Sequence, residues 1–462
     1  MKNLIKITVL TLLFISCKSV ENEDTSTYFG GQIVNPKDNF ITLMKGEKAL
    51  DTIYLNKDNT FSKRLDYIKE GLYSFTHGSV TQGYEYQYIY FEPKDSIVIR
   101  LNTWDFDESL VFSGKGAEKN NFLITLYLQN EKEGKLFGPY YNLKPTEFLT
   151  KTATITSLNQ HIYNQLKGSG VELTEKFNEL AKVTVDYPIY IKKEVYPFIH
   201  KKRFQLDSFP SLPSTYYDFR KGIDLNNSDL IDYSPYHNYV NNYLYNLSYK
   251  ESAKKTTATE NILNVIVTKI KIPEFKNRLL YQAIYNDFRG NKNSCCINDS
   301  ALQIFNEHCT DEKLLERINY LANDCKNSKD QHPIEDFELL TLNNSKTRLK
   351  TIIKNKKSVV YFWSPEIMSS KMLIKRITGL EKKHPSIKFV GINMHPSSND
   401  ARVNKFLKNQ FTLSKESIGN KLIKSMEPRT ILIDKNGIVA NSFTYLSSQY
   451  LEKQLLALEQ ND

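Results

Sequence analysis

The stretch Ser358-Val-Val-Tyr-Phe-Trp363 decides the fold of the C-terminal part of this chain. It is almost wholly apolar, which is typical of a strand that is buried on both faces of a sheet. From Pro365 to Lys383 the apolar residues recur at helical spacing, and Ile387-Lys-Phe-Val-Gly-Ile392 is a second apolar run. The order strand, helix, strand predicts a βαβ unit with parallel strands.

More elements of the same kind follow. Arg429-Thr-Ile-Leu-Ile-Asp434 and Ile438-Val-Ala-Asn-Ser-Phe443 predict two strands, and the Lys435-Asn-Gly437 turn between them predicts a hairpin. Residues 333–462 are therefore expected to form one α/β domain. The helices expected in it, besides the one from Pro365, are Ala401 to Lys408, Lys421 to Met426 and Tyr450 to Leu458.

Three phrases of this region carry a family resemblance: Val360-Tyr-Phe-Trp363, Phe389-Val-Gly-Ile-Asn393 and Pro428-Arg-Thr-Ile-Leu-Ile-Asp-Lys-Asn-Gly437. In them the chain resembles the thioredoxin-like domain of TlpA-type thiol–disulfide oxidoreductases of the bacterial envelope. The resemblance implies an α/β thioredoxin fold for residues 333–462. It also implies a Cys-x-x-Cys at the start of the first helix, where the helix N-terminus lowers the pKa of the attacking thiol.

That pair of cysteines is missing. Counted from Trp363, the resemblance places it at Ile367 and Ser370, and no cysteine occurs after Cys325. A serine hydroxyl cannot form a mixed disulfide, and isoleucine has no nucleophile. We therefore predict no catalytic residue, and a redox-inactive domain that binds or scaffolds a protein or peptide. The alternative is a thiol–disulfide oxidoreductase that acts through non-standard cysteines or through a partner's thiols.

Pro428 is the second diagnostic residue of the family. The resemblance implies a cis proline here, with the backbone of Glu427 pairing with an extended peptide by strand addition. Trp363, Glu427 and Pro428 are accordingly candidate residues of a peptide groove. The other interpretation of Pro428 is turn geometry that was inherited with the fold.

The N-terminal part, residues 28–116, predicts a β-sandwich, because short apolar-alternating runs are separated by turn residues. It resembles the small β-domain that precedes thioredoxin-like domains in envelope proteins, in the phrases Phe91-Glu-Pro-Lys-Asp-Ser-Ile97 and Phe112-Ser-Gly-Lys-Gly116. The expected strands contain Ile41 to Met44, Thr52 to Leu55, Leu72 to Phe75, Tyr88 to Phe91 and Ile97 to Leu101.

Residues 117–332 predict a helical domain between the other two, because apolar residues recur at helical spacing. Tyr236 to Tyr249, YHNYVNNYLYNLSY, is either a sugar-binding aromatic platform or, as we prefer, helical core with an amphipathic rim. The prolines that we expect to break this domain into pieces are Pro188, Pro197, Pro210, Pro213 and Pro235.

Four of the five cysteines lie in the helical domain: Cys295, Cys296, Cys309 and Cys325. An exported protein meets an oxidising compartment, so two disulfides are one expectation. Buried free thiols, and a redox or metal role, are the other two. His308 beside Cys309 does not complete a common zinc spacing, and we predict no metal site.

The fifth cysteine ends the N-terminal segment MKNLIKITVLTLLFISC. Lys2 and Lys6 form a basic region, and Ile7 to Ile15 is too short and too close to the terminus for a membrane span. The segment resembles a bacterial lipoprotein signal, with residues 1–16 removed and Cys17 lipidated; an ordinary secretory signal is the alternative. Residues 17–27 read as a tether or as a surface-export signal.

Composition limits the remaining function classes. The net charge of +10 over 462 residues falls to +8 when the two signal lysines are removed, and the other lysines are spread along the chain. A solvated basic surface explains this charge, and no nucleic-acid module is evident. No HExxH, GxSxG or Walker pattern occurs, so no cofactor is predicted. The expected partners are the membrane, through lipidated Cys17, and an unknown envelope protein or peptide. The expected location is the cell envelope: the outer membrane, facing the periplasm or the surface. A glycan-binding protein that works through the β-domain is a third, weaker hypothesis.

Overall fold

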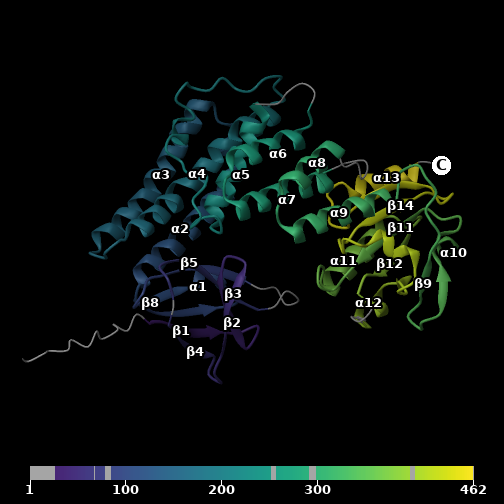
Figure 1. Cartoon of the computed structure of the whole chain (residues 1–462), viewed down its shortest axis with the longest axis horizontal. Coiled ribbons are helices and arrows are strands. Elements are labelled where there is room, and N and C mark those ends of the chain that lie inside the picture. The colour runs from purple at the N-terminus through teal and green to yellow at the C-terminus, as the bar shows by residue number, and fades with distance from the viewer. Residues whose placement is uncertain are drawn as a thin grey trace, which may run out of the picture.

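The structure is a computed structural model that describes residues 26–66, 68–78, 85–250, 256–290, 298–395 and 401–460. Its helices lie between two sheet-containing parts, and they contact both of them (Figure 1). The N-terminal sheets lie beside α2, and the C-terminal sheet lies beside α9 (Figure 1). Cys17, the expected lipidation site, and residues 1–16 lie outside the described residues, as do Cys295 and Cys296.

Two four-stranded sheets form the N-terminal part, in the orders β4-β1-β7-β8 and β3-β2-β5-β6. Alternate side chains of both sheets meet in one core, which includes Phe29, Phe75 and Ile97, so the arrangement is a sandwich. In β1, a Cβ atom at Gly31 would lie 2.3 Å from the carbonyl oxygen of Ile99, which explains why glycine stands there. The bounds are β1 Thr27–Val34, β2 Phe40–Lys45, β3 Lys48–Tyr54, β4 Thr60–Leu65, β5 Gly71–His77, β6 Glu85–Phe91, β7 Ser96–Asn102, the short helix α1 Phe106–Ser109 and β8 Val111–Lys115.

Helices α2 to α9 lie between Ala117 and Lys326. Their shared core includes Leu126, Tyr239 and Ile284. None of the helices in the described part of the chain combines the length and apolar character that crossing a membrane requires. The bounds are α2 Ala117–Leu136, α3 Pro145–Gly168, α4 Glu175–Arg203, α5 Ser234–Lys250, α6 Ala258–Lys269, α7 Pro273–Gly290, α8 Asp299–His308 and α9 Glu312–Lys326, with 3-10 turns at Gly138–Asn142 and Asp218–Arg220.

One expectation about this part is wrong. Pro188 and Pro197 do not break the chain, because both lie inside the continuous helix α4. The helix is held by a buried face that includes Phe177, Val185 and Tyr196, and this packing outweighs the hydrogen bonds that the two prolines remove.

A seven-stranded sheet, in the order β10-β9-β13-β12-β11-β14-β15, forms the C-terminal part. β11 pairs in parallel with β12, so the predicted βαβ unit is present. On its other side β11 pairs antiparallel with β14. β14 pairs antiparallel with β15, which is the predicted hairpin. The six residues of β11 are all buried, and apolar cores lie on both faces of the sheet. The bounds are β9 Glu338–Leu340, β10 Lys346–Arg348, α10 Leu349–Ile353, β11 Ser358–Trp363, α11 Ser370–Lys383, β12 Lys388–Asn393, α12 Ala401–Phe406, β13 Gln410–Thr412, a 3-10 turn Ile418–Leu422, β14 Thr430–Ile433, β15 Val439–Thr444 and α13 Leu451–Gln460.

Two predicted helices of this domain differ from the structure. The helix expected from Pro365 begins at Ser370, because a turn precedes it and Ser369 caps its first backbone N–H groups. The helix expected over Lys421 to Met426 is replaced by the 3-10 turn Ile418–Leu422, which ends before Met426 takes a left-handed φ of 57°.

Candidate functional site

Strand pairing brings the predicted groove residues together. β11 ends at Trp363, and β14 runs antiparallel beside it with Tyr361 opposite Thr430. The backbone N–H of Phe362 donates to the carbonyl of Arg429 at 2.8 Å, so Pro428 lies next to the end of β11. Here the structure has a cavity of about 320 Å³. Its lining includes Trp363, Ile367, Met368, Met372, Glu427, Pro428, Thr430, Tyr445 and Tyr285.

The turn before α11 decides what occupies the position of the family thiols. The backbone N–H groups of Ile367 and Met368 both donate to the carbonyl of Ser364, at 3.1 and 3.0 Å. This turn leaves the side chain of Ile367 54% exposed at the edge of the cavity. Ser370 is the first residue of α11 and is not part of the lining. The cavity therefore presents an apolar side chain at the position where the sequence resemblance implies the attacking thiol.

Glu427 is held by the helical part of the chain. Its carboxylate accepts hydrogen bonds from the hydroxyl of Tyr285 on α7 at 2.8 Å and from Nε of Arg317 on α9 at 3.1 Å. The guanidinium of Arg317 also lies 5.5 Å from the ring centroid of Tyr281. Glu427 is only 6% exposed, so its side chain is not available to an incoming peptide. The site is consequently built from two parts of the chain, with α7 and α9 beside the Glu427 wall.

Asp324, near the end of α9, fixes the segment before Glu427. Its carboxylate accepts hydrogen bonds from the backbone N–H groups of Lys424 and Ser425, both at 3.0 Å, and from the Ser425 hydroxyl at 2.6 Å. Burial raises the pKa of Asp324 although these hydrogen bonds favour its ionised form. This anchor positions the chain that leads into the cavity wall.

Arg429 is fully buried behind the same wall. Its Nη1 donates to the backbone carbonyl of Asp324 at 2.8 Å, and its guanidinium lies 5.6 Å from the ring centroid of Phe443. Nε and Nη2 have no hydrogen-bond partner in the described part of the chain. Desolvation lowers the pKa of Arg429 to about 10. The guanidinium thus depends on α9 for its one hydrogen bond to a described residue.

The expected cis bond at Pro428 is wrong. No cis peptide bond occurs among the described residues, so the Glu427–Pro428 bond is trans. Trans is the favoured form of an X–Pro bond by roughly 0.5–1 kcal/mol. The chain reverses one residue earlier, at Met426 with its left-handed φ of 57°, and the contacts of Asp324 and Glu427 hold it there.

Two buried polar groups of the lining have no partner in the described part of the chain. They are the indole Nε1 of Trp363 and the hydroxyl of Thr430. Most buried polar groups in proteins are hydrogen-bonded, since leaving one unpaired costs about 1–3 kcal/mol. Both atoms expose almost no surface, so they belong to the wall of the cavity and are not open to a bound molecule.

The two described cysteines of the helical part, Cys309 and Cys325, are not among the residues that line this cavity. Cys325 on α9 is disulfide-bonded, and its partner lies outside the described residues. The expectation of two disulfides is wrong for Cys309, which is a buried free thiol whose pKa is raised by burial. Cys309 directly follows α8, and Asp311 caps the next helix, α9. Among the described residues, no group of three or more His, Cys, Asp or Glu side chains is arranged to hold a metal ion.

Several residues of the site could not be recognised from the sequence. Tyr285 and Arg317 come from helices more than 100 residues before Glu427, and only the packing of the helical part against the sheet brings them there. Met372 and Tyr445 look like ordinary helix and strand-end residues in the sequence. The unbroken apolar run that ends at Trp363 was the usable signal.

Comparisons with known proteins give a partial likeness. No family model matches the sequence, and no curated protein matches it. Similar solved structures include the thioredoxin domain of a thiol-disulfide oxidoreductase from Bacteroides vulgatus, with 17% identity, a TM-score of 0.22 and coverage of 28% of this chain and 96% of that one. A thiol:disulfide interchange protein from Bacteroides sp. has 19% identity, a TM-score of 0.20 and coverage of 25% and 80%. A thiol peroxidase from Chromobacterium violaceum has 19% identity, a TM-score of 0.23 and coverage of 29% and 88%.

Proposed function

We propose that this chain is a lipid-anchored envelope protein whose C-terminal domain binds a partner polypeptide, without disulfide exchange, at the cavity beside Trp363 and Pro428. The observation that carries the proposal is the side chain at the edge of that cavity. Ile367 stands at the attacking position of the resembling family, and no cysteine follows Cys325 in the sequence. A thiol–disulfide exchange needs a thiolate to attack the substrate sulfur, so this cavity has no group that starts the reaction.

The chemistry of the cavity favours an apolar segment of a polypeptide. Ile367 and Met372 expose 54% and 62% of their surface at its edge, so two large apolar side chains are open to a partner at the same cavity. Methionine adapts its shape to different partners, so Met368 and Met372 suit a binding surface.

The location belongs to the proposal as well. The lipoprotein-like signal supports cleavage before Cys17 and lipidation of its thiol, with the protein held at the outer membrane and facing the periplasm or the surface. Metabolic labelling with an alkyne fatty acid tests this step. The full chain should take up the label, and Cys17→Ala should lose it; equal labelling of both would refute lipidation at this residue.

Site-specific photo-crosslinking in cells tests the binding site. A photoreactive residue at position 367 or 372 should capture a polypeptide. The matched control is position 456, where Leu456 on α13 is 52% exposed, and it should not capture the same product. Equal capture from all three positions would show nonspecific contact and would refute a binding site at this cavity.

An insulin-reduction assay on the full chain separates the proposal from its alternative. We expect no turnover with dithiothreitol beyond the uncatalysed rate. Catalysed turnover would instead support a thiol–disulfide oxidoreductase that acts through Cys295, Cys296, Cys309 or Cys325. Of these four cysteines, Cys325 is disulfide-bonded. The double variant Ile367→Cys/Ser370→Cys is the positive control, because it introduces a Cys-x-x-Cys that ends at the first residue of α11.

A further inference from the structure

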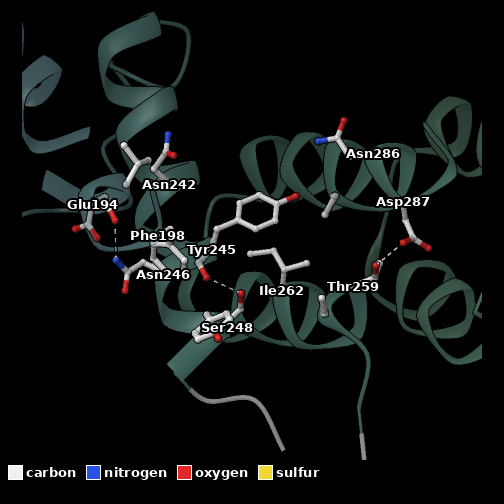
Figure 2. A pocket seen from close by; sticks show the side chains of 14 residues that line it. Glu194, Phe198, Asn242, Tyr245, Asn246, Ser248, Thr259, Ile262, Asn286 and Asp287 are labelled. Atoms are coloured by element: carbon white, nitrogen blue, oxygen red, sulfur yellow. Dashed lines mark hydrogen bonds between the residues drawn. The ribbon is translucent and has the colours of Figure 1, made fainter. Parts of the chain in front are cut away.

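A second cavity lies within the helical part, and its described lining residues differ from those of the cavity beside Trp363. It has a volume of about 450 Å³ and is lined by residues of α4, α5, α6 and α7 (Figure 2). This volume is within the range of small-molecule sites in proteins, about 300–1,000 Å³. The proposed function makes no use of it.

Aromatic rings form one wall of this cavity. Tyr245 and Tyr249 lie one turn apart on α5, and both keep exposed surface, 37% and 51%. Phe198 from α4 packs edge-to-face against Tyr249, with 5.2 Å between ring centroids. The residues Tyr236 and Tyr239, earlier on the same helix, are buried in the core instead. Helix α5 therefore has core tyrosines at its start and cavity tyrosines at its end.

Amide, hydroxyl and carboxylate groups accompany the rings. Asn242, Asn286 and Asp287 belong to the lining: Asn242 lies on α5, the helix that also carries Tyr245, and Asn286 and Asp287 lie on α7 (Figure 2). Asp287 accepts a hydrogen bond from the Thr259 hydroxyl at 2.8 Å, and Asn242 donates one of its N–H groups to the carbonyl of Asn238, also at 2.8 Å. Each amide and carboxylate has more hydrogen-bonding positions than these contacts use.

The charge of the lining limits the ligand. The described residues that line the cavity include neither lysine nor arginine. Of the two acids among them, Glu194 is already paired, because its carboxylate accepts a hydrogen bond from Nε of Arg220 at 2.8 Å. A phosphate or carboxylate ligand would meet Asp287 and would find no cation among the described lining residues. A lipid tail would leave the amides without hydrogen bonds.

We propose that this cavity binds a neutral saccharide. A pyranose has an apolar face of C–H groups, which packs on an aromatic ring, and a rim of hydroxyls that both donate and accept hydrogen bonds. The exposed rings of Tyr245 and Tyr249 match the first property. The side chains of Asn242, Asn286 and Asp287 match the second. The inference does not depend on peptide binding at Trp363.

Saturation-transfer NMR on the full chain tests the inference with defined probes. The neutral probes are maltotriose, cellotriose, xylotriose, mannotriose and diacetylchitobiose, and trigalacturonic acid is the anionic comparison. We expect saturable binding of at least one neutral probe with a Kd no weaker than about 1 mM, and weaker binding of the anion. Absence of saturable binding by all five neutral probes would overturn the proposal, as would tighter binding of the anion.

Variants tie the signal to the cavity. Tyr249→Ala and Asn286→Ala should each weaken binding about tenfold, the loss of one good contact. Tyr249→Phe keeps the ring and should bind within about twofold of the original chain, by the same scale. Tyr54→Ala removes a tyrosine that is 67% exposed on β3, and it should leave binding unchanged. Equal losses of saccharide affinity in Tyr249→Ala and Tyr54→Ala would place the saccharide elsewhere and refute the assignment. Crosslinking from position 367 tests the cavity beside Trp363 separately.

Discussion

The contact between Arg317 and Glu427 allows a quantitative test of how the two parts of the site are held together. In Arg317→Ala the buried carboxylate of Glu427 keeps only the hydroxyl of Tyr285 among its described side-chain donors. A fully buried ion pair that loses one partner costs about 3–5 kcal/mol, and an exposed pair costs about 0–1 kcal/mol. Glu427 is buried but the side chain of Arg317 is 51% exposed, so we expect a loss of about 1.5–3 kcal/mol, the range for hydrogen bonds to charged groups.

Tryptophan fluorescence offers a local assay. The chain has two tryptophans; Trp104 is 77% exposed on the β-sandwich side, whereas Trp363 is buried in the candidate site. In a Trp104→Phe background, Trp363 alone reports on this region during urea unfolding. A local reporter is needed because a chain with several cores does not unfold as one two-state unit. With a slope of about 1–3 kcal/mol per molar urea, the expected shift of the midpoint is roughly 1 M to lower urea.

The control and the double variant decide between explanations. Arg348→Ala removes an arginine whose ion pair with Asp336, at 2.7 Å, is mostly exposed, and it should cost less than about 1 kcal/mol. Glu427→Gln removes the buried charge. In this background, Arg317→Ala should lower the free energy of unfolding by at least about 1 kcal/mol less than it does in the original chain. A shift in Arg317→Ala no larger than that of Arg348→Ala would refute the argument that α9 holds the cavity wall.

Three further predictions concern the rest of the molecule. The carboxylate of Asp311 caps α9 by accepting two backbone hydrogen bonds at 3.0 Å. Asp311→Ala should lower the free energy of unfolding in the Trp363 assay by about 0.5–2 kcal/mol. An unchanged urea midpoint would contradict this prediction. Gly31→Ala places a methyl group 2.3 Å from the carbonyl oxygen of Ile99 and should destabilise the β-sandwich by about 1–3 kcal/mol. Hydrogen exchange of the β1 amides measures this loss. Faster exchange confined to other strands would count against the clash. Burial raises the pKa of Asp95 to about 6, above the ordinary value of 3.8, so the stability that its protonated form contributes is complete below pH 3.8 and is lost as the pH rises through 6. Asp95→Asn should therefore flatten the fall in melting temperature between pH 4 and 7, and an identical pH profile in both proteins would disprove this assignment.

The sequence was sufficient for the elements that depend on local pattern. The apolar run ending at Trp363 and the turn at Lys435-Asn-Gly437 predicted paired strands, and these are present. Strands β9, β10 and β13 were not predicted, because each has only three residues and too little alternation to recognise. The start of α11 was misjudged by five residues, since the periodic pattern does not show where a cap such as Ser369 acts.

The candidate site was only half predictable for a different reason. Trp363, Ile367, Glu427 and Pro428 were named from the sequence, and all four line one cavity. The orientation of Glu427 depends on Arg317, a residue 110 positions earlier, and sequence pattern carries no information on such long-range contacts. The trans bond before Pro428 is a similar case, because it follows from what holds the preceding loop.

The burial of Arg429 limits which fragments of this chain can fold alone. Its guanidinium has one hydrogen bond in the described chain, to the carbonyl of Asp324, and that acceptor belongs to helix α9, 105 residues earlier in the sequence. A fragment that begins after α9 would enclose the charge of Arg429 without its acceptor, and burying an unpaired charge is costly. The C-terminal sheet and α9 are therefore expected to fold as one unit, although the sequence divides them between two domains.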